Sequence, residues 1–367
     1  MLIPTLVVAA GLLAVAGTLL SFSRSPHWGI RIWDFPRVQV ALLAGASAAV
    51  YAAFFFRGRP LQWAFLAATL LSVARQVRKI FPYTPLARVQ VERSRKPPHE
   101  RVGFRLLISN VLMENTRHEL LLERIRESDP DLVLAVETDA RWDAALAPLE
   151  ADYPYVVRQP QENYYGMVLY SRLPLIGPRV DFLVQDDIPS VHTAFELPGG
   201  VRVFLHGVHP RPPEPIRDQD STPRDAELVV LGRAIGETED RPTVVAGDLN
   251  DVAWSRSSEL FLRLSGLLDP RVGRGFYNSY NAKNPLFRYP LDHVFHSADF
   301  RLVEIRRCAS VGSDHFPMLL ELSYEPAARA DQPEPPLDPD DVEEAEEILE
   351  KEAEAAQTGD DRPGRGE

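Results

Sequence analysis

The stretch Thr243-Val-Val-Ala-Gly-Asp-Leu-Asn250 predicts a buried strand that ends in two polar side chains. Its run of β-branched and small apolar residues is typical of a strand covered on both faces. Gly247 allows a sharp turn, and Asp248 and Asn250 have the same parity, so both point to one side of the strand end. A carboxylate beside an amide suits a site where a water is deprotonated while an oxyanion gains charge. The same pattern also occurs as a plain turn after a strand, so the rest of the chain must decide.

The net charge of −12 is unevenly distributed along the 367 residues. Residues 1–100 contain 12 basic and 3 acidic side chains, residues 101–325 contain 24 and 34, and residues 326–367 contain 4 and 15. The acidic middle region lacks the electrostatic footprint of a protein that grips duplex nucleic acid nonspecifically, although a local basic rim is compatible with it. The single cysteine, Cys308, excludes an intramolecular disulfide and a cysteine-based metal site, and we expect its thiol to be buried.

Three apolar runs occupy the first 80 residues. Residues 2–22 and 38–56 carry no charge and are long enough to cross a bilayer core of about 30 Å. Residues 61–80 form a third span if the basic residues near their end snorkel, and otherwise an interfacial helix. A signal peptide is the competing interpretation of the first run, but this run lacks a basic n-region and more apolar runs follow. A soluble helical domain is the alternative for all three.

We therefore predict a helical anchor in a lipid bilayer over residues 1–81. The basic residues of the loops favour different sides of the membrane for two and for three spans, so the side stays open. Residues 82–101, which contain four prolines, predict a linker. Residues 326–367 are Pro-rich and then strongly acidic, and they predict a disordered tail that binds an unknown partner.

From Phe104 onward, alternating strand and helix patterns predict an α/β domain over residues 102–325. Strands are expected at residues 104–110, 132–137, 165–171, 193–197, 202–206, 243–247, 291–297, 301–308 and 317–323. Two of them form a hairpin that turns at Gly199-Gly200. Helices are expected at residues 116–128, 139–150, 224–238 and 256–265, and the first begins with a capping box of Thr116 and Glu119.

Several of these strands end in a polar or ionisable side chain. Strand ends on the same edge of a sandwich converge into one pocket. A pocket that holds Glu137, Asp248, Asp292 and Asp314 would be costly unless a divalent cation neutralised it. Oxygen ligands without cysteine indicate Mg²⁺ or Mn²⁺. Two histidines nearby, with a carboxylate to orient one of them, suggest phosphate-ester chemistry.

The order of these positions carries a resemblance. Asn110 … Glu137 … His209 … Gly247-Asp248-Leu249-Asn250 … Leu291-Asp292-His293 … Ser313-Asp314-His315 resembles the endonuclease/exonuclease/phosphatase superfamily, which has the DNase I-like fold. The resemblance covers roughly residues 103–324. It implies a four-layer α-β-β-α sandwich preceded by two to three transmembrane helices. The first 100 residues look like the membrane anchor of some bacterial members, which implies a multi-pass protein of the bacterial inner membrane.

The resemblance also implies roles for the metal-binding and water-activating positions. Asn110 and Glu137 would hold the catalytic Mg²⁺ or Mn²⁺, with Asp314 beside the metal site. Asp248 would orient or deprotonate the attacking water, and Asn250 would contact the phosphate oxygen.

The remaining roles fall on three further positions. His315 would hydrogen-bond the scissile phosphate, with Asp292 fixing its tautomer and charge. His209 would help to stabilise the leaving group or the phosphate. We expect His206, His293 and His296 to be structural.

The sequence departs from the family pattern at two places. Glu137 lies in Val-Glu-Thr rather than the usual Gln-Glu, which removes a side chain near the metal. Asn110 lacks an acidic residue two places on, which puts a second metal ligand in doubt. Glu114 and Asn115 are candidates to compensate, unless Asn115 only caps the following helix.

The leading hypothesis is a membrane-anchored, metal-dependent phosphoesterase that attacks a phosphate ester in line with an activated water. Among phosphoesterases, a phosphodiesterase or nuclease is the first hypothesis, and a phospholipid- or inositol-phosphate-directed hydrolase is the alternative. A non-catalytic membrane scaffold that keeps the fold is the rival from another class.

Overall fold

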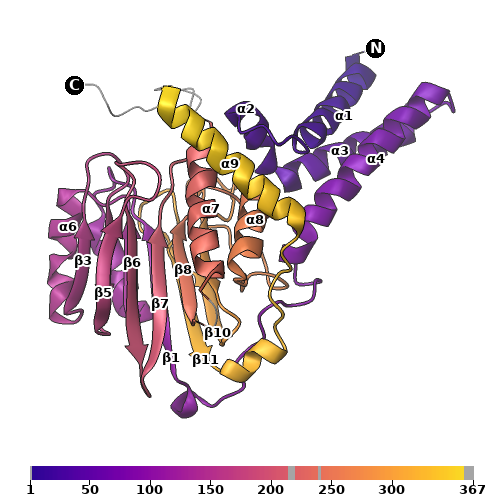
Figure 1. Ribbon diagram of the computed structural model, residues 1–367. Helices are drawn as coiled ribbons and strands as arrows, with labels where there is room; N and C mark the ends of the chain where they lie inside the picture. Colours follow the sequence, from indigo (N-terminus) through magenta and orange to yellow (C-terminus); the bar gives the residue numbers. More distant parts are fainter. Residues whose placement is uncertain (1, 214–219, 239–240, 359–367) are drawn as a thin grey trace.

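Two β-sheets packed face to face form the centre of the protein (Figure 1). The computed structural model describes residues 2–213, 220–238 and 241–358. One sheet has the order β10-β11-β1-β2-β4-β3, with strands Phe300–Arg307, Met318–Tyr324, Gly103–Asn110, Leu132–Val136, Met167–Ser171 and Tyr155–Gln159. The other has the order β5-β6-β7-β8-β9, with strands Leu175–Asp181, Ser190–Leu197, Val201–Val208, Thr243–Asp248 and Asp292–His296.

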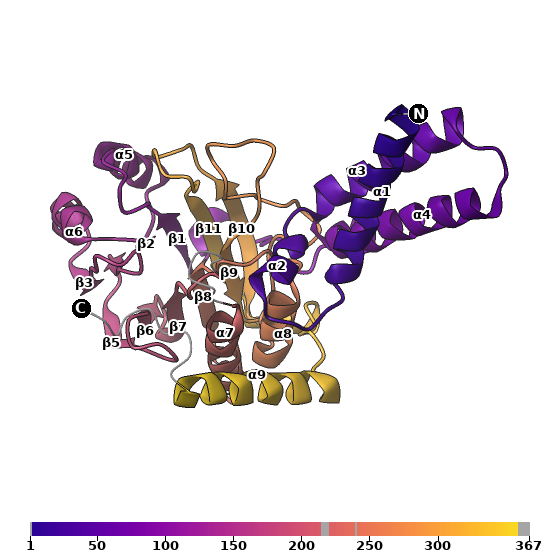
Figure 2. The ribbon, with the colours of Figure 1, turned by 90° about the horizontal axis from the view of Figure 1, so that it is seen from above.

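Each sheet is mainly antiparallel but contains one parallel pair, β1 with β2 and β7 with β8. Each parallel pair is joined by a helix-containing crossover, as parallel neighbours require. The crossovers include α5 (His118–Ser128) and α7 (Thr222–Gly236). The carboxyl ends of both pairs lie at the same edge of the sandwich, because Asn110 at the end of β1 contacts Asp248 at the end of β8; Figure 2 shows the molecule from above this edge.

Helices cover the outer faces of both sheets. Apolar side chains of α5 and α6 (Ala140–Leu146) pack on the first sheet, and those of α7 and α8 (Arg256–Ser265) pack on the second. Between the sheets, strands from both contribute to one core cluster, as with Phe104 against Phe195. The order of layers is the predicted α-β-β-α sandwich.

Strand β8, which the opening stretch predicts, is buried along its whole length. Gly247 in this strand has φ +146°, and a Cβ there would lie 1.9 Å from the carbonyl oxygen of Val208. Only glycine fits so close to the neighbouring strand. This close approach holds the turn that follows against β7 and fixes where Asp248 points.

Two strands and one helix start differ from the predictions. β3 and β5 were not expected; each is the edge strand of its sheet and is partly exposed, so its sequence pattern is weak. The predicted capping box does not form, because α5 begins at His118 without a side-chain cap. Asn115 instead donates to the carbonyl oxygens of Val111 and Val311, which ties this loop to the domain.

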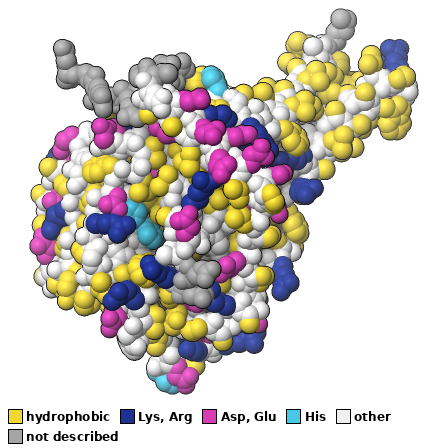
Figure 3. Space-filling model, in the orientation of Figure 1, with side chains coloured by type: hydrophobic (Ala, Val, Ile, Leu, Met, Phe, Trp, Pro, Cys, Tyr) yellow, Lys and Arg dark blue, Asp and Glu magenta, His cyan; other side chains and the backbone are white. Residues whose placement is uncertain are grey.

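Helices α1 (Leu2–Leu20), α3 (Arg37–Phe54) and α4 (Pro60–Ile80) form an N-terminal bundle that projects from the sandwich (Figures 1 and 2). α1 and α3 are long and apolar enough to cross a membrane, which by itself is weak evidence. α4 does not meet the same criterion, since its last turns are charged. Figure 3 shows the bundle as an arm covered mainly by apolar side chains.

The predicted linker over residues 82–101 is wrong, because this segment packs on the sandwich. Tyr83 and Val91 are buried, and Val91 belongs to the core between the sheets. The Tyr83 hydroxyl donates to the carbonyl oxygen of Ala253 at 2.7 Å, and Arg93 forms a bridge to Leu302 of β10. The prolines favour an extended backbone, but the apolar side chains of this segment pack into the core, so the segment is not a flexible linker.

The predicted disordered tail is also wrong for residues 326–358. These residues include helix α9 (Pro339–Thr358), which lies across α7 and α8 (Figure 1). Ala345, Ile348 and Leu349 pack against side chains of both helices. The acidic side chains pair with the chain's own arginines, as Glu344 does with Arg256 and Asp341 with Arg263. Residues 359–367 lie outside the described part.

Candidate active site

The predicted site residues come from the strand ends at one edge of the sandwich. Asn110 is the last residue of β1, and Glu137 follows the last residue of β2. Asp248 ends β8 and is paired directly with Asp292, the first residue of β9. Both sheets contribute carboxylates to this edge, so the site lies where the two layers meet. Unpaired, two carboxylates facing each other across a strand pair would be destabilising.

Asn110 connects the carboxylates of the two sheets. Its side-chain nitrogen donates to Glu137 Oε1 at 2.7 Å and to Asp248 Oδ2 at 3.0 Å. Its oxygen accepts a bond from the backbone N–H of Leu112 at 3.0 Å. Because an amide oxygen has two lone pairs, one remains for a further partner. Glu137 also accepts from the backbone N–H of Met113 at 3.4 Å.

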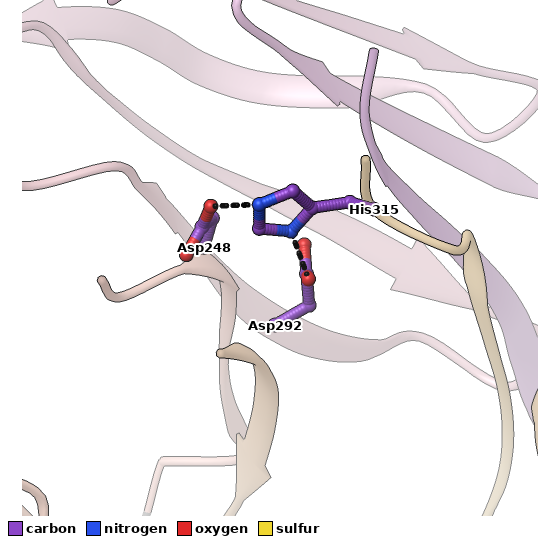
Figure 4. A group of neighbouring side chains, drawn as sticks. All are labelled: Asp248, Asp292 and His315. Carbon is purple, nitrogen blue, oxygen red and sulfur yellow. Dashed lines mark hydrogen bonds and ion pairs between the residues drawn. The ribbon is translucent and has the colours of Figure 1, made fainter. Parts of the chain in front are cut away.

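His315 lies between the facing carboxylates (Figure 4). Its Nδ1 is 2.7 Å from Asp292 Oδ2, and its Nε2 is 3.5 Å from Asp248 Oδ2. Tyr280 covers the imidazole ring at a centroid distance of 4.9 Å. The three charged side chains are 5% exposed or less, so these interactions are poorly screened by water.

Burial and charge set the protonation of this group. Burial alone lowers the pKa of His315, but the charges of Asp292 and Asp248 outweigh it and raise the pKa to about 10. Burial raises the pKa of Asp248, yet the charges of His315 and His209 and the bonds from Asn110 and Asn250 bring it below its usual value. At neutral pH the imidazole is therefore a cation and the Asp248 carboxyl is an anion.

Glu137 behaves differently. Burial raises its pKa to about 7, although the hydrogen bond from Asn110 opposes this. The charge of His315 also opposes this rise in pKa, while the charges of Asp248 and Asp314 contribute to it. The protein therefore supplies too little positive charge at this carboxylate to hold it fully ionised at neutral pH.

Two groups of side chains are candidates for a cation site, and the geometry favours the pair of Glu137 and Asn110. The other is a triad, Asp248, Asp292 and His315, whose ligand atoms lie within 4.8 Å of one another. In that triad, however, the imidazole already occupies the space between the carboxylates. Around Glu137 the donors are oxygen atoms with unused lone pairs and uncompensated negative charge, and Mg²⁺ and Mn²⁺ prefer such a donor set. The residues present fit a divalent cation there.

Asn250 follows Asp248 in a left-handed conformation with φ +52°. Its backbone N–H donates to Asp248 Oδ1 at 2.9 Å, which fixes the carboxylate. Its side-chain nitrogen donates to the carbonyl oxygen of Pro210 at 3.0 Å, leaving one N–H for another acceptor. Asp248 and Asn250 therefore form the plain turn that the sequence pattern allowed, and their side chains also contribute to the candidate site.

His209 and Asp314 lie at the margins of the group. His209 Nε2 is 4.0 Å from Asp248 Oδ2, and burial lowers the pKa of His209 to about 4. Its Nδ1 has no hydrogen-bond partner among the described residues. Asp314 is half-buried and lines the cavity described next. Glu114 and Asn115 do not reach the site as extra ligands: Asn115 binds backbone, and Glu114 bonds the Tyr164 hydroxyl.

A cavity of about 610 Å³ opens over these residues. Glu137, Asn250 and His315 line its polar end. Its opposite wall comes from the segment between α1 and α3, which contributes Trp28 and Phe35. In Figure 2, α2 (Trp28–Arg31) lies next to the ends of β8 and β9. Sequence reasoning missed this wall and Tyr280, since no local pattern relates residues 28–36 to the strand ends.

Buried ion pairs connect the N-terminal bundle to the loop that follows β8. The chain of contacts, spaced 2.5–3.9 Å, runs through Arg37, Asp34, Arg31, Asp225, Arg224 and Asp251. Arg224 also donates to the carbonyl oxygen of Asn250 at 3.0 Å. At the other end, Arg37 donates to Gln76 of α4 at 3.0 Å. The sequence contained these residues but no motif that joins them.

Comparison with known proteins identifies the class. Residues 107–315 match the Endonuclease/Exonuclease/phosphatase family, so the chain belongs to this family. Members of the family are typically metal-dependent phosphoester hydrolases. No curated protein matches the chain.

Solved structures share the fold at low sequence identity. The catalytic domain of human Nocturnin with bound sulfate is 16% identical, covers 60% of this chain and 94% of its own, and has a TM-score of 0.50. A family protein from Bacteroides thetaiotaomicron is 14% identical over 62% of this chain and 99% of its own, with a TM-score of 0.49. D. rerio TDP2 complexed with a single-strand DNA product is 15% identical over 60% and 99%, with a TM-score of 0.48.

Proposed function

We propose that the protein is a membrane-anchored, divalent-metal-dependent phosphoesterase that hydrolyses a phosphate ester by in-line attack of a water. The observation that carries this proposal is the cationic His315 between two buried carboxylates, with the Asn110–Glu137 pair beside it. Among the ion pairs of the described residues, none joins Glu137 to a lysine or arginine, and the charge of His315 offsets that of its carboxylate only in part.

In the proposed mechanism, Asn110 and Glu137 hold Mg²⁺ or Mn²⁺, with Asp314 at the edge of the site. The bound ion would neutralise phosphate charge and lower the pKa of water. Asp248 is held in place by the backbone N–H of Asn250, so its carboxylate can orient the water and accept its proton.

The remaining residues act on the phosphate. His315 presents Nε2–H to a phosphate oxygen while Asp292 holds Nδ1 and keeps the ring charged. The N–H of Asn250 that Pro210 does not use donates to the same group. His209 is neutral near pH 7 and serves the leaving group as a hydrogen-bonding partner, not as a charge.

Membrane anchorage is supported by the exposed apolar surface of the bundle. Leu13, Leu42 and Leu71 are each more than half exposed, and they lie on three different helices. Contiguous apolar surface of this kind is rare on proteins that meet only water. We propose that α1, α3 and α4 together cross a bacterial inner membrane, because the chain leaves the sandwich along α3 and returns to it along α4, with the charged end of α4 at the membrane surface.

The test is hydrolysis by the full chain in lipid nanodiscs with Mg²⁺ or Mn²⁺. The substrates are a small chromogenic phosphodiester, single- and double-stranded DNA, RNA and phospholipids. We expect metal-dependent turnover, which falls by about 10²–10⁴-fold in Asp248→Ala and in His315→Ala while the thermal unfolding transition persists. Turnover that survives either substitution would exclude this site, and the absence of metal-dependent turnover of every substrate would leave the scaffold hypothesis.

A further inference from the structure

The cavity over the catalytic residues has two chemically different ends. Its inner end carries Glu137, Asp314 and His315. Its outer wall is formed by Trp28, Ile32, Phe35 and Pro36, and the apolar side chains of Phe287 and Leu291 also line the cavity. A ligand that fills this cavity must therefore be polar at one end and apolar at the other.

The outer wall belongs to the N-terminal bundle. Trp28, Ile32 and Phe35 lie in the segment that joins α1 to α3, the two helices that are long and apolar enough to cross a membrane. Gly17 of α1 lies against the ring of Trp33, and a Cβ there would meet that ring at 2.1 Å. This close packing holds the wall segment directly on the bundle.

The facing side of the mouth is also attached to the bundle. Leu286 and Phe287 are 73% and 50% exposed, in the loop that follows Tyr280. Gln39 of α3 donates to the carbonyl oxygen of Leu286 at 2.7 Å. Ile32, on the opposite side, is 55% exposed. Exposed apolar side chains therefore lie both at the cavity mouth and on the adjoining bundle.

The charge of the cavity argues against a polynucleotide. Among the described residues that line it, none is lysine or arginine. Proteins that hold a nucleic-acid backbone place basic side chains along successive phosphates, in addition to aromatic platforms. A ligand with one phosphate group at the metal site and a hydrocarbon chain beyond it needs no such track.

We infer that the substrate is an amphipathic phosphate ester taken from the lipid bilayer. Its phosphate lies at His315 and Glu137, and its hydrocarbon chain runs past Ile32, Phe35 and Phe287 toward the membrane. A volume of about 610 Å³ takes the phosphate and the first part of one chain, while the rest stays in the bilayer. Diacyl phospholipids and polyisoprenyl phosphates share this chemistry.

The reaction is a hydrolysis, and this inference rests on the proposed function. The water oxygen forms a new P–O bond and the ester P–O bond breaks. One proton of the water ends on the leaving alcohol and the other stays on the phosphate product. No oxidant, reductant or second substrate is required.

The test uses p-nitrophenyl phosphodiesters whose second ester group is ethyl, butyl or octyl, with the full chain in nanodiscs. We expect kcat/KM to rise with chain length by up to about fourfold per CH₂ that enters the cavity. Ile32→Ser and Phe287→Ser should reduce the octyl-to-ethyl ratio of kcat/KM by about tenfold. Phe182→Ser, which alters a similarly exposed aromatic residue that does not line the cavity, should keep the wild-type ratio.

The outcomes separate the two proposals. If none of the three diesters is hydrolysed with either metal, the proposed function fails. If the ethyl diester is hydrolysed but the ratio stays near one, or DNA is the better substrate, the lipid inference is overturned and the phosphoesterase stands. If the ratio rises with chain length as expected, vesicles that contain either phosphatidylglycerol or a polyisoprenyl phosphate identify the lipid source, because only the true substrate is consumed.

Discussion

Two buried ionic groups lie side by side in this protein, and their charges are arranged in opposite ways. The group that links the bundle to the sandwich has three arginines and three aspartates, each in contact with an opposite charge. The group proposed to be catalytic has the carboxylates of Asp248 and Asp292 on either side of a single imidazole, and Asn110 joins Glu137 to Asp248. Balanced charges stabilise the junction between the bundle and the sandwich. A surplus of negative charge instead favours the binding of a divalent cation, which in turn can bind a phosphate.

The largest expected effect comes from breaking the imidazole pair. Asp292→Asn removes the charge that keeps His315 protonated, so we expect kcat to fall by about 10²–10⁴-fold. The alkaline limit of activity should move to lower pH, because the pKa of His315 drops. A pH–rate profile of the variant checks this. An unchanged alkaline limit would mean that Asp292 only supports the fold.

The next effect comes from breaking the balanced group. Arg224→Gln leaves Asp225 and Asp251 buried without their common partner, and we expect a loss of about 3–5 kcal/mol in unfolding free energy. Activity should fall too, since Arg224 holds the carbonyl oxygen of Asn250. Chemical denaturation measures the loss. Arg241→Gln, an exposed arginine, should change stability by less than about 0.5 kcal/mol.

The same comparison predicts a stabilising substitution in the catalytic group. Glu137 has a pKa raised to about 7, so its ionised form costs stability as the pH rises from the unfolded-state pKa through 7. Glu137→Gln should raise the stability of metal-free protein by about 1 kcal/mol at pH 8 and have little effect near pH 4. Thermal unfolding with a chelator tests it. Destabilisation at pH 8 would show that Glu137 is part of a balanced network.

A further effect follows from the titration of His315. Its folded-state pKa of about 10 lies above its unfolded value of about 6.5. Its contribution to stability is therefore complete below about pH 6.5 and is lost as the pH rises toward 10. Melting curves of metal-free wild type and His315→Gln should converge over this range. A constant difference between the two would contradict the assignment of a charged imidazole.

The edge that carries the candidate site was largely predictable from sequence because strand ends are local features. Asp248, Asn250 and Glu137 follow runs of apolar residues that mark buried strands, and His315 lies in a short motif after them. In a sandwich with this topology, such ends must meet. The resemblance to the family then supplied roles that the residues alone do not define.

Tertiary contacts that carry no local pattern were not predictable. Residues 28–36 look like a loop between two apolar helices, yet they form a wall of the cavity. Helix α9 looked disordered because its composition is acidic. Its apolar face, made of Ala345, Ile348 and Leu349, is narrow. Its acidic side chains pair with arginines of α8 that are distant in sequence. One pattern did indicate that another element packs on α7. Its residues 228–231 are all apolar, and an amphipathic surface helix would carry polar residues among them.

The central claim is that the unbalanced carboxylate group is a metal-dependent catalytic site, and the most direct test is the hydrolysis rate as a function of Mn²⁺ concentration. We predict a saturating curve for wild type, a similar half-saturation for Asp225→Asn in its folded fraction, and an increase of at least about tenfold in half-saturation for Glu137→Gln. A Glu137→Gln curve that superimposes on wild type, or a wild-type rate that does not depend on Mn²⁺, would contradict the account.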